Sequence, residues 1–137
     1  MRVVIQRVSE ASVSIEKKEI STIKSGVMIL LGIEHEDTEE DAKWLVRKIC
    51  SLRIFSDENG NMNRSIQDIQ GEVLLVSQFT LHAKVKKGNR PSFINAAKPE
   101  IANDLYETTK NLFESELKRN IATGKFGAMM QVQLVND

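Results

Sequence analysis

The chain has 137 residues, of which 19 are lysine or arginine and 19 are aspartate or glutamate, so its formal net charge at pH 7 is zero. This length predicts one domain over residues 1–137, and the charge balance excludes a global field for nucleic acid or membranes, so any polyanion site has to be a local patch. A single cysteine, Cys50, excludes an internal disulfide framework, and the lack of a signal-peptide core or of about 20 consecutive apolar residues predicts a cytoplasmic protein without a membrane span.

The first part of the chain predicts strands. Val3–Val8 and Ala11–Glu16 alternate apolar and polar residues, as half-buried strands do, and Lys17 and Lys18 are expected at the turn that follows. The segment Gly26–Ile33 is nearly continuously apolar, which predicts a strand covered on both faces.

Two helices are predicted from apolar residues that recur at helical spacing. In the first helix, Thr38 followed by Asp41 resembles a capping box. Its apolar positions are Ala42, Leu45, Val46, Ile49 and Leu52. The second helix begins near Pro99, which suits a first turn, and ends at Asn120. Its apolar positions are Ile101, Leu105, Thr109, Leu112, Phe113 and Leu117.

The remaining segments complete a mixed fold. Ser56–Asn63 has the composition of a turn, Glu72–Ala83 reads as a long strand, Thr123–Gly127 as a loop and Ala128–Val135 as a final strand. The order of strands, helix, strands, helix and strand predicts an α/β domain in three layers, β/β/α, with two main helices packed on one face of a mixed sheet.

The predicted strand that starts at Glu72 ends in polar residues. Ser77, Gln78 and Thr80 lie there, with no acidic residue or histidine between them to activate a hydroxyl. The two histidines, His35 and His82, are too few and too far apart in sequence to indicate a metal site, so each is expected to be a surface or strand-end residue. No Ser-His-Asp order, Walker loop or Gly-x-Gly-x-x-Gly is present, so these residues alone identify no nucleophile.

A basic loop follows the polar strand end. Within this loop, Lys84–Phe93, the cations Lys86, Lys87 and Arg90 lie close together in sequence. Such a loop can be an ordinary charged surface, or it can neutralise a nucleic-acid backbone. Its position beside the polar strand end favours contact with one end of a polynucleotide.

Several segments together resemble one family. "SQFTL" at Ser77–Leu81 is similar to the first signature motif of the D-aminoacyl-tRNA deacylases. The segments "IQRVSEASV", "LLGIEHEDTEEDA", "RIFSDENGNMN", "KKGNRPSF" and "TGKFGAMMQVQLVND" follow in the family's order and spacing. The resemblance implies hydrolysis of the ester that joins a D-amino acid, or achiral glycine, to the terminal adenosine of tRNA. It also implies a β/β/α homodimer with active sites at the interface, and neither metal nor organic cofactor.

The resemblance assigns catalysis to the motif Ser77, Gln78, Phe79 and Thr80. Aminoacyl esters are labile, so orientation and backbone N–H groups that stabilise an oxyanion can do much of the work, with the adenosine's free hydroxyl assisting the attacking water. Ser77 and Gln78 would fix geometry, and Phe79 would contribute its main-chain N–H. Thr80 is the alternative, as a side-chain nucleophile, but nothing nearby in sequence would activate it.

Other residues are expected to bind substrate. The arginine that matches Arg7 supports the cross-subunit Gly-Pro loop in the family. Ala96 and Ala97 are expected to border the aminoacyl pocket, and Met129 and Met130 to form core or pocket wall. With Lys86, Lys87 and Arg90, these residues form the predicted substrate-binding set.

The sequence departs from the family after "VND". The family's second signature, Gly-Pro-Val-Thr, has a cis Gly-Pro bond that reaches into the partner's site and excludes L-amino acids. The sequence ends at Asp137, so a C-terminal truncation is expected, with weaker discrimination against L-substrates and an exposed or paired strand edge. Two classes of function stay open: a D-aminoacyl-tRNA deacylase, and a tRNA 3′-end binding protein of the same fold without turnover.

Overall fold

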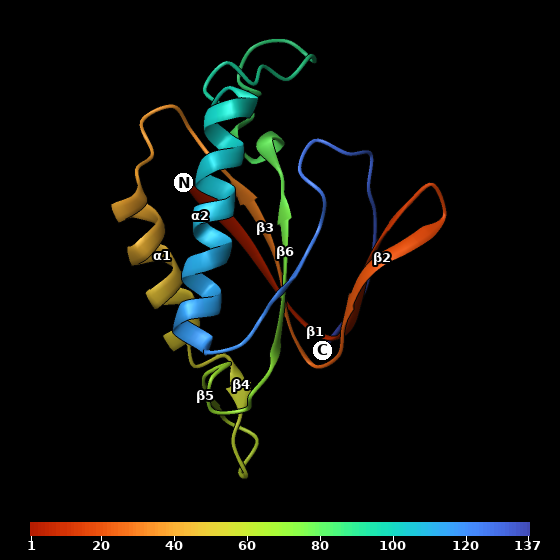
Figure 1. The fold of residues 1–137 in the computed structure, drawn as a ribbon, viewed down its shortest axis with the longest axis vertical. Helices are drawn as coiled ribbons and strands as arrows, with labels where there is room; N and C mark the ends of the chain where they lie inside the picture. The colour runs from red at the N-terminus through yellow and green to blue at the C-terminus, as the bar shows by residue number, and fades with distance from the viewer.

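The computed structural model describes residues 1–137 and combines two α-helices with short and long strands (Figure 1). Its elements are β1 (Arg2–Ile15), β2 (Lys18–Ile23), β3 (Gly26–Gly32), α1 (Glu39–Ser51), β4 (Phe55–Ser56), β5 (Met62–Arg64), β6 (Glu72–Ser77), the 3-10 turn Phe79–His82, α2 (Pro99–Leu117), β7 (Ala122–Thr123) and β8 (Gln131–Asn136). Neither helix is long and apolar enough to cross a membrane.

The strands form one main sheet in which β1 takes part twice. The order is β2-β1-β3-β6-β7, and β8 also pairs with β1. The first half of β1 pairs antiparallel with β3, and the second half pairs with β2 and β8. In Figure 1, α1 and α2 lie side by side on one side of β3 and β6, while β2 and the C-terminal segment lie on the other side. The predicted α/β fold, with two helices packed on a sheet, is confirmed.

The strand β3 explains how the layers are held together. Alternate residues Val27, Ile29 and Leu31 belong to the cluster of 18 buried residues that also contains the helix residues. Met28 belongs to the second cluster, of seven residues, on the other face of the sheet, and Leu30 packs against it. Apolar side chains on both faces of β3 therefore confirm the predicted doubly covered strand.

Strand boundaries differ from the prediction at three places. The two strands predicted before Lys17 are one strand, β1, which carries an irregularity between Val8 and Glu10 where β8 pairs with it. The turn lies at Glu16 and Lys17, both with positive φ, so Lys18 already belongs to β2. The last strand begins at Gln131 rather than Ala128, because a turn at Phe126 and Gly127 precedes it and residues 128–130 pair with no strand.

The prediction of a strand from Glu72 to Ala83 was wrong beyond Ser77. The N–H of Gln78 donates to the carbonyl oxygen of Leu31 at 2.8 Å. β3 ends at Gly32, so no further residue of β3 is available for pairing. The chain turns instead, with Leu81 donating to the Gln78 carbonyl and Ala83 to the Thr80 carbonyl. These are the short-range bonds of a 3-10 turn, so most of the motif lies on a turn and not on a strand.

The helices confirm most of their predicted faces. In α1, the carboxylate of Asp41 accepts hydrogen bonds from the N–H and the hydroxyl of Thr38, both at 2.8 Å. Burial raises the pKa of the Cys50 thiol to about 12, so the thiol stays protonated and acts as an apolar core group.

In α2, the prediction of Ile101 as a core position was wrong, because it is exposed and Ala102 is buried instead. The helix ends at Leu117 rather than Asn120, with the next residue in the left-handed region.

Candidate functional site

The end of β6 sits at the edge of the sheet where its parallel neighbour β3 also ends. Leu31 is the register partner of Ser77, the last residue of β6. The 3-10 turn starts two residues later and carries Phe79 and Thr80 away from the sheet. Because carboxyl ends of parallel strands meet at one edge, the polar strand end lies beside the residues that follow β3.

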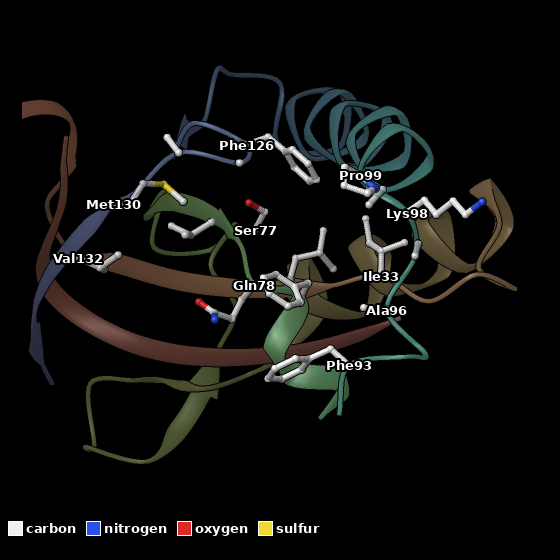
Figure 2. Close-up of a pocket in the computed structure, with 17 residues that line it drawn as sticks. Ile33, Ser77, Gln78, Phe93, Ala96, Lys98, Pro99, Phe126, Met130 and Val132 are labelled. Atoms are coloured by element: carbon white, nitrogen blue, oxygen red, sulfur yellow. The ribbon is translucent and has the colours of Figure 1, made fainter. Parts of the chain in front are cut away.

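A cavity of about 610 Å³ opens at this edge (Figure 2). It is lined by 17 residues, 12 of them hydrophobic, so it suits an apolar group held by few polar contacts. In Figure 2, Ser77 and Gln78 lie between Met130 and Val132 on one side and Ile33 with Ala96 on the other. The predicted residues Ser77, Gln78, Phe79, Ala96 and Ala97 all line this cavity.

One wall of the cavity connects the sheet to the start of α2. Ala97 donates its N–H to the Ile33 carbonyl at 2.9 Å, and Lys98 and Pro99 follow it at the cavity. Pro99 is the first residue of α2, so the positive end of the helix dipole lies at this wall, whereas the amino group of Lys98 points away from the cavity in Figure 2. A group with negative charge is therefore favoured here.

The mouth of the cavity carries an aromatic pair. The rings of Phe79 and Phe93 are 5.2 Å apart between centroids and inclined by 78°, which is an edge-to-face contact. Phe79 is 57% exposed although it belongs to the motif. An exposed aromatic ring beside an apolar cavity is a surface on which a flat group or a second protein can rest.

Thr80 does not line the cavity, and its hydroxyl is held by a neighbour. The side-chain amide of Gln78 donates to the Thr80 Oγ1. No hydrogen bond joins Thr80 to a histidine or carboxylate anywhere in the chain, so the structure supplies no base to activate this hydroxyl.

Other residues in the predicted substrate-binding set lie outside the cavity. Lys86, Lys87 and Arg90 are exposed on the basic loop, whose ends are joined by mutual backbone hydrogen bonds between Lys84 and Ser92. The loop leaves the same 3-10 turn that carries the motif.

Two further predicted residues also lie away from the cavity lining. The guanidinium of Arg7 donates to the carbonyl oxygens of Asp137 at 2.6 Å and Ile54 at 2.7 Å. Met129 is 92% exposed, whereas its neighbour Met130 lines the cavity.

Phe93, Lys98 and Phe126 are among the lining residues that were not predicted as site residues. The only sequence signal for Lys98 was its place directly before the helix-starting Pro99. Phe93 and Phe126 come from loops whose approach to β6 depends on the tertiary fold.

His82 departs from its prediction as a surface or strand-end residue. It is 4% exposed, inside the 3-10 turn, and its Nδ1 lies 3.0 Å from Oε1 of Glu34. His35 is exposed, as predicted. No group of three histidine, cysteine, aspartate or glutamate side chains is arranged to hold a metal ion.

Comparison with known proteins gives consistent relatives. The family described as "D-Tyr-tRNA(Tyr) deacylase" matches residues 4–137. A protein of Cytophaga hutchinsonii named D-aminoacyl-tRNA deacylase is 60% identical over 137 residues, which cover 100% of this chain and 91% of the relative. A protein of the same name from Christiangramia forsetii is 54% identical with the same coverage.

Two solved structures share the fold. One, described as "c-Myc DNA Unwinding Element Binding Protein", has a TM-score of 0.95 and 44% identity, and the match covers 100% of this chain and 93% of that one. The other, described as a probable eukaryotic D-amino acid tRNA deacylase, has a TM-score of 0.84 and 16% identity over 98% of this chain and 93% of that one, which shows the fold alone.

Proposed function

Because the chain belongs to the D-Tyr-tRNA(Tyr) deacylase family, as the sequence predicted, we propose that it hydrolyses the ester bond of D-aminoacyl-tRNA. The products are a free D-amino acid and tRNA. The observation that carries the proposal is the Ser77–Thr80 motif at an apolar cavity of about 610 Å³ whose other wall contains the N-terminus of α2. Glycyl-tRNA is proposed as a second substrate, because glycine has no side chain that such a cavity would have to exclude.

The proposed mechanism uses the backbone of the 3-10 turn. The N–H groups of Phe79 and Thr80 open the turn, and a helical turn leaves its first N–H groups without partners inside the turn. Aimed at the ester carbonyl, they would stabilise the oxyanion that forms when water attacks the carbonyl carbon. The ester C–O bond then breaks, and the terminal adenosine's hydroxyl leaves with a proton.

The Gln78–Thr80 contact supports a role for Thr80 other than attack. Its oxygen already accepts a hydrogen bond from the Gln78 amide, which lowers the electron density available for a nucleophile. The hydroxyl proton remains free to donate. We therefore assign Gln78 and Thr80 the role of fixing the geometry of the turn. The free hydroxyl of the substrate's terminal adenosine assists the attacking water.

The acceptor end of tRNA is the proposed macromolecular partner. The cations Lys86, Lys87 and Arg90 extend from the turn that carries the motif, and Lys98 lies at the cavity itself. Phosphates next to the terminal adenosine would contact these cations when the ester enters the cavity. The proposed site of action is accordingly the cytoplasm, where aminoacyl-tRNA is made and used.

A homodimer with sites at the interface is proposed from the exposed apolar groups around the cavity. Phe79 and Met129 are largely exposed, and Val132 and Val135 on β8 are also exposed. Apolar patches of this kind next to a functional cavity usually mark a protein contact. Sedimentation equilibrium tests the dimer, and a monomer at all concentrations would contradict it.

A hydrolysis assay separates the enzyme from a tRNA-binding protein of the same fold. Excess protein is mixed with tRNA carrying a labelled D-amino acid, and both binding and release of the label are measured. The proposal predicts release well above the spontaneous rate. Binding without accelerated release would favour the tRNA-binding protein. If the protein neither binds the tRNA nor accelerates release, both functions are refuted. The matched L-aminoacyl-tRNA and glycyl-tRNA in parallel measure the substrate preference.

A further inference from the structure

His82 is a buried polar residue that the proposed reaction does not use. It is 4% exposed, and neither ring nitrogen makes a hydrogen bond of regular geometry. Its Nδ1 nevertheless lies 3.0 Å from Oε1 of Glu34, whose side chain is 38% exposed. Burying an imidazole costs free energy unless a partner compensates, so the close carboxylate is the feature that makes this position tolerable.

The histidine is part of the turn that carries the proposed oxyanion donors. His82 ends the turn, three residues after Phe79. Its ring packs against Gly32 at the end of β3, where an added Cβ would lie 2.9 Å from His82 Cδ2 and 3.0 Å from the Gln78 carbonyl oxygen. The turn is thus seated on β3 through the His82 ring and the Gln78 backbone, which the missing side chain of Gly32 permits.

Glu34 is part of the opposite side of the site. It follows β3 and forms a backbone bridge with Ala96, while the next bond in that segment joins Ala97 to Ile33 at 2.9 Å. Its own N–H donates to Asp37 Oδ2 at 2.6 Å, which fixes the segment locally. The backbone of Glu34 therefore holds the Ala96–Ala97 wall of the cavity, and its side chain reaches the turn.

We propose that Glu34 and His82 form a positioning pair that fixes the 3-10 turn relative to the Ala96–Ala97 wall. Neither residue lines the cavity, so the pair acts through the groups it holds. The inference rests on the proposed function, because its kinetic effect concerns the Phe79 and Thr80 N–H groups as oxyanion donors. Such donors act mainly in the transition state, so disturbing them lowers kcat more than it raises KM.

Substitutions on both sides of the pair test the proposal. His82→Leu removes the imidazole at similar size, His82→Asn keeps an N–H donor near the position of Nδ1, and Glu34→Gln keeps the shape without the charge. We expect His82→Leu to lower kcat on D-aminoacyl-tRNA by about 10- to 100-fold, the range for a displaced catalytic group, while KM changes by less than about threefold. His82→Asn should recover part of the loss.

The double variant and a matched control sharpen the result. If the residues act as a pair, Glu34→Gln combined with His82→Leu should cost no more than His82→Leu alone. His35→Leu alters the other histidine, which is exposed, and should leave kcat and KM unchanged. Equal losses in kcat and 1/KM, or full additivity of the two substitutions, would overturn the proposal.

Amide resonances separate this proposal from the proposed function. In Glu34→Gln, at a partly exposed position that is expected to fold, the backbone amides of Phe79 and Thr80 should shift together with that of Ala96. His35→Leu should move none of them. If the wild-type protein fails to hydrolyse D-aminoacyl-tRNA, the proposed function fails, and these shifts still decide the coupling. Unchanged Phe79 and Thr80 amides in Glu34→Gln would overturn the pair even in an active enzyme.

Discussion

Thr80→Ala distinguishes backbone catalysis from side-chain attack. The substitution removes the hydroxyl that accepts the Gln78 amide and leaves the N–H of residue 80 in place. A neutral hydrogen bond contributes about 0.5–1.5 kcal/mol. If all of it were lost only in the transition state, the rate would fall by about 2- to 13-fold, since about 1.4 kcal/mol is a factor of ten.

A nucleophile would behave very differently. Removing the nucleophile of an enzyme that uses one costs about six orders of magnitude in kcat. The two expectations therefore differ by at least about a thousandfold, far more than the uncertainty of either. The side chain of Thr80 is not needed for the proposed oxyanion contact, which uses the main chain.

The assay is single-turnover release of a labelled D-amino acid by excess protein, with the melting temperature measured on the same sample. We expect Thr80→Ala to retain hydrolysis within about 13-fold of wild type. Thr80→Ser is the matched control, because it restores a hydroxyl. A loss beyond a thousandfold that serine rescues, with the fold unchanged, would show that Thr80 attacks the ester and would refute the backbone mechanism.

Three other predictions concern tRNA binding, packing and acid stability. Alanine at the three basic-loop cations should lower the slope of log affinity for tRNA against log salt by about 2 to 3, and an unchanged slope would show that the loop makes no phosphate contacts. Gly26→Ala would place Cβ 1.9 Å from the Glu72 carbonyl oxygen, so chemical denaturation should show that the free energy of unfolding falls by about 3 kcal/mol or more. Gly60→Ala is the control and should lower it less, because the added atom meets open space. Similar losses in the two variants would contradict the packing argument. Hydrogen bonds from Thr38 lower the pKa of Asp41. The Asp41 carboxylate therefore stabilises the fold above the pKa of the unfolded state, and this stabilisation is lost as pH falls through the folded pKa. Asp41→Asn should reduce the dependence of the unfolding free energy on acid pH, and an unaltered dependence would contradict this reasoning.

Local sequence patterns predicted the elements whose burial or capping depends on neighbouring residues in the chain. The continuous apolar run of β3 and the Thr38–Asp41 start of α1 have the expected structures because burial on both faces and helix capping leave direct marks in sequence. The end of β6 left no such mark. Phe79 and Leu81 continue the alternation of a strand, but the ladder stops when β3 ends and Gln78 has made its last bond to it.

The site was predictable where a motif or the family resemblance points to particular residues. Ser77 and Gln78 were found through the motif and do line the cavity. Phe126 and Lys98 reach the same cavity from distant segments, and no periodicity indicates that approach. His82 was misjudged for the same reason, because its burial depends on Gly32 and on a carboxylate far away in sequence.

Single-turnover hydrolysis in water enriched in oxygen-18 tests the central claim most directly. Excess protein is mixed with D-aminoacyl-tRNA, and both the released amino acid and the intact protein are weighed by mass spectrometry. The account predicts accelerated release of D-amino acid with one heavy oxygen in its carboxyl group and no acylated protein at any time. Release no faster than in buffer, or an acyl adduct on the chain that forms and decays with the reaction, would contradict it.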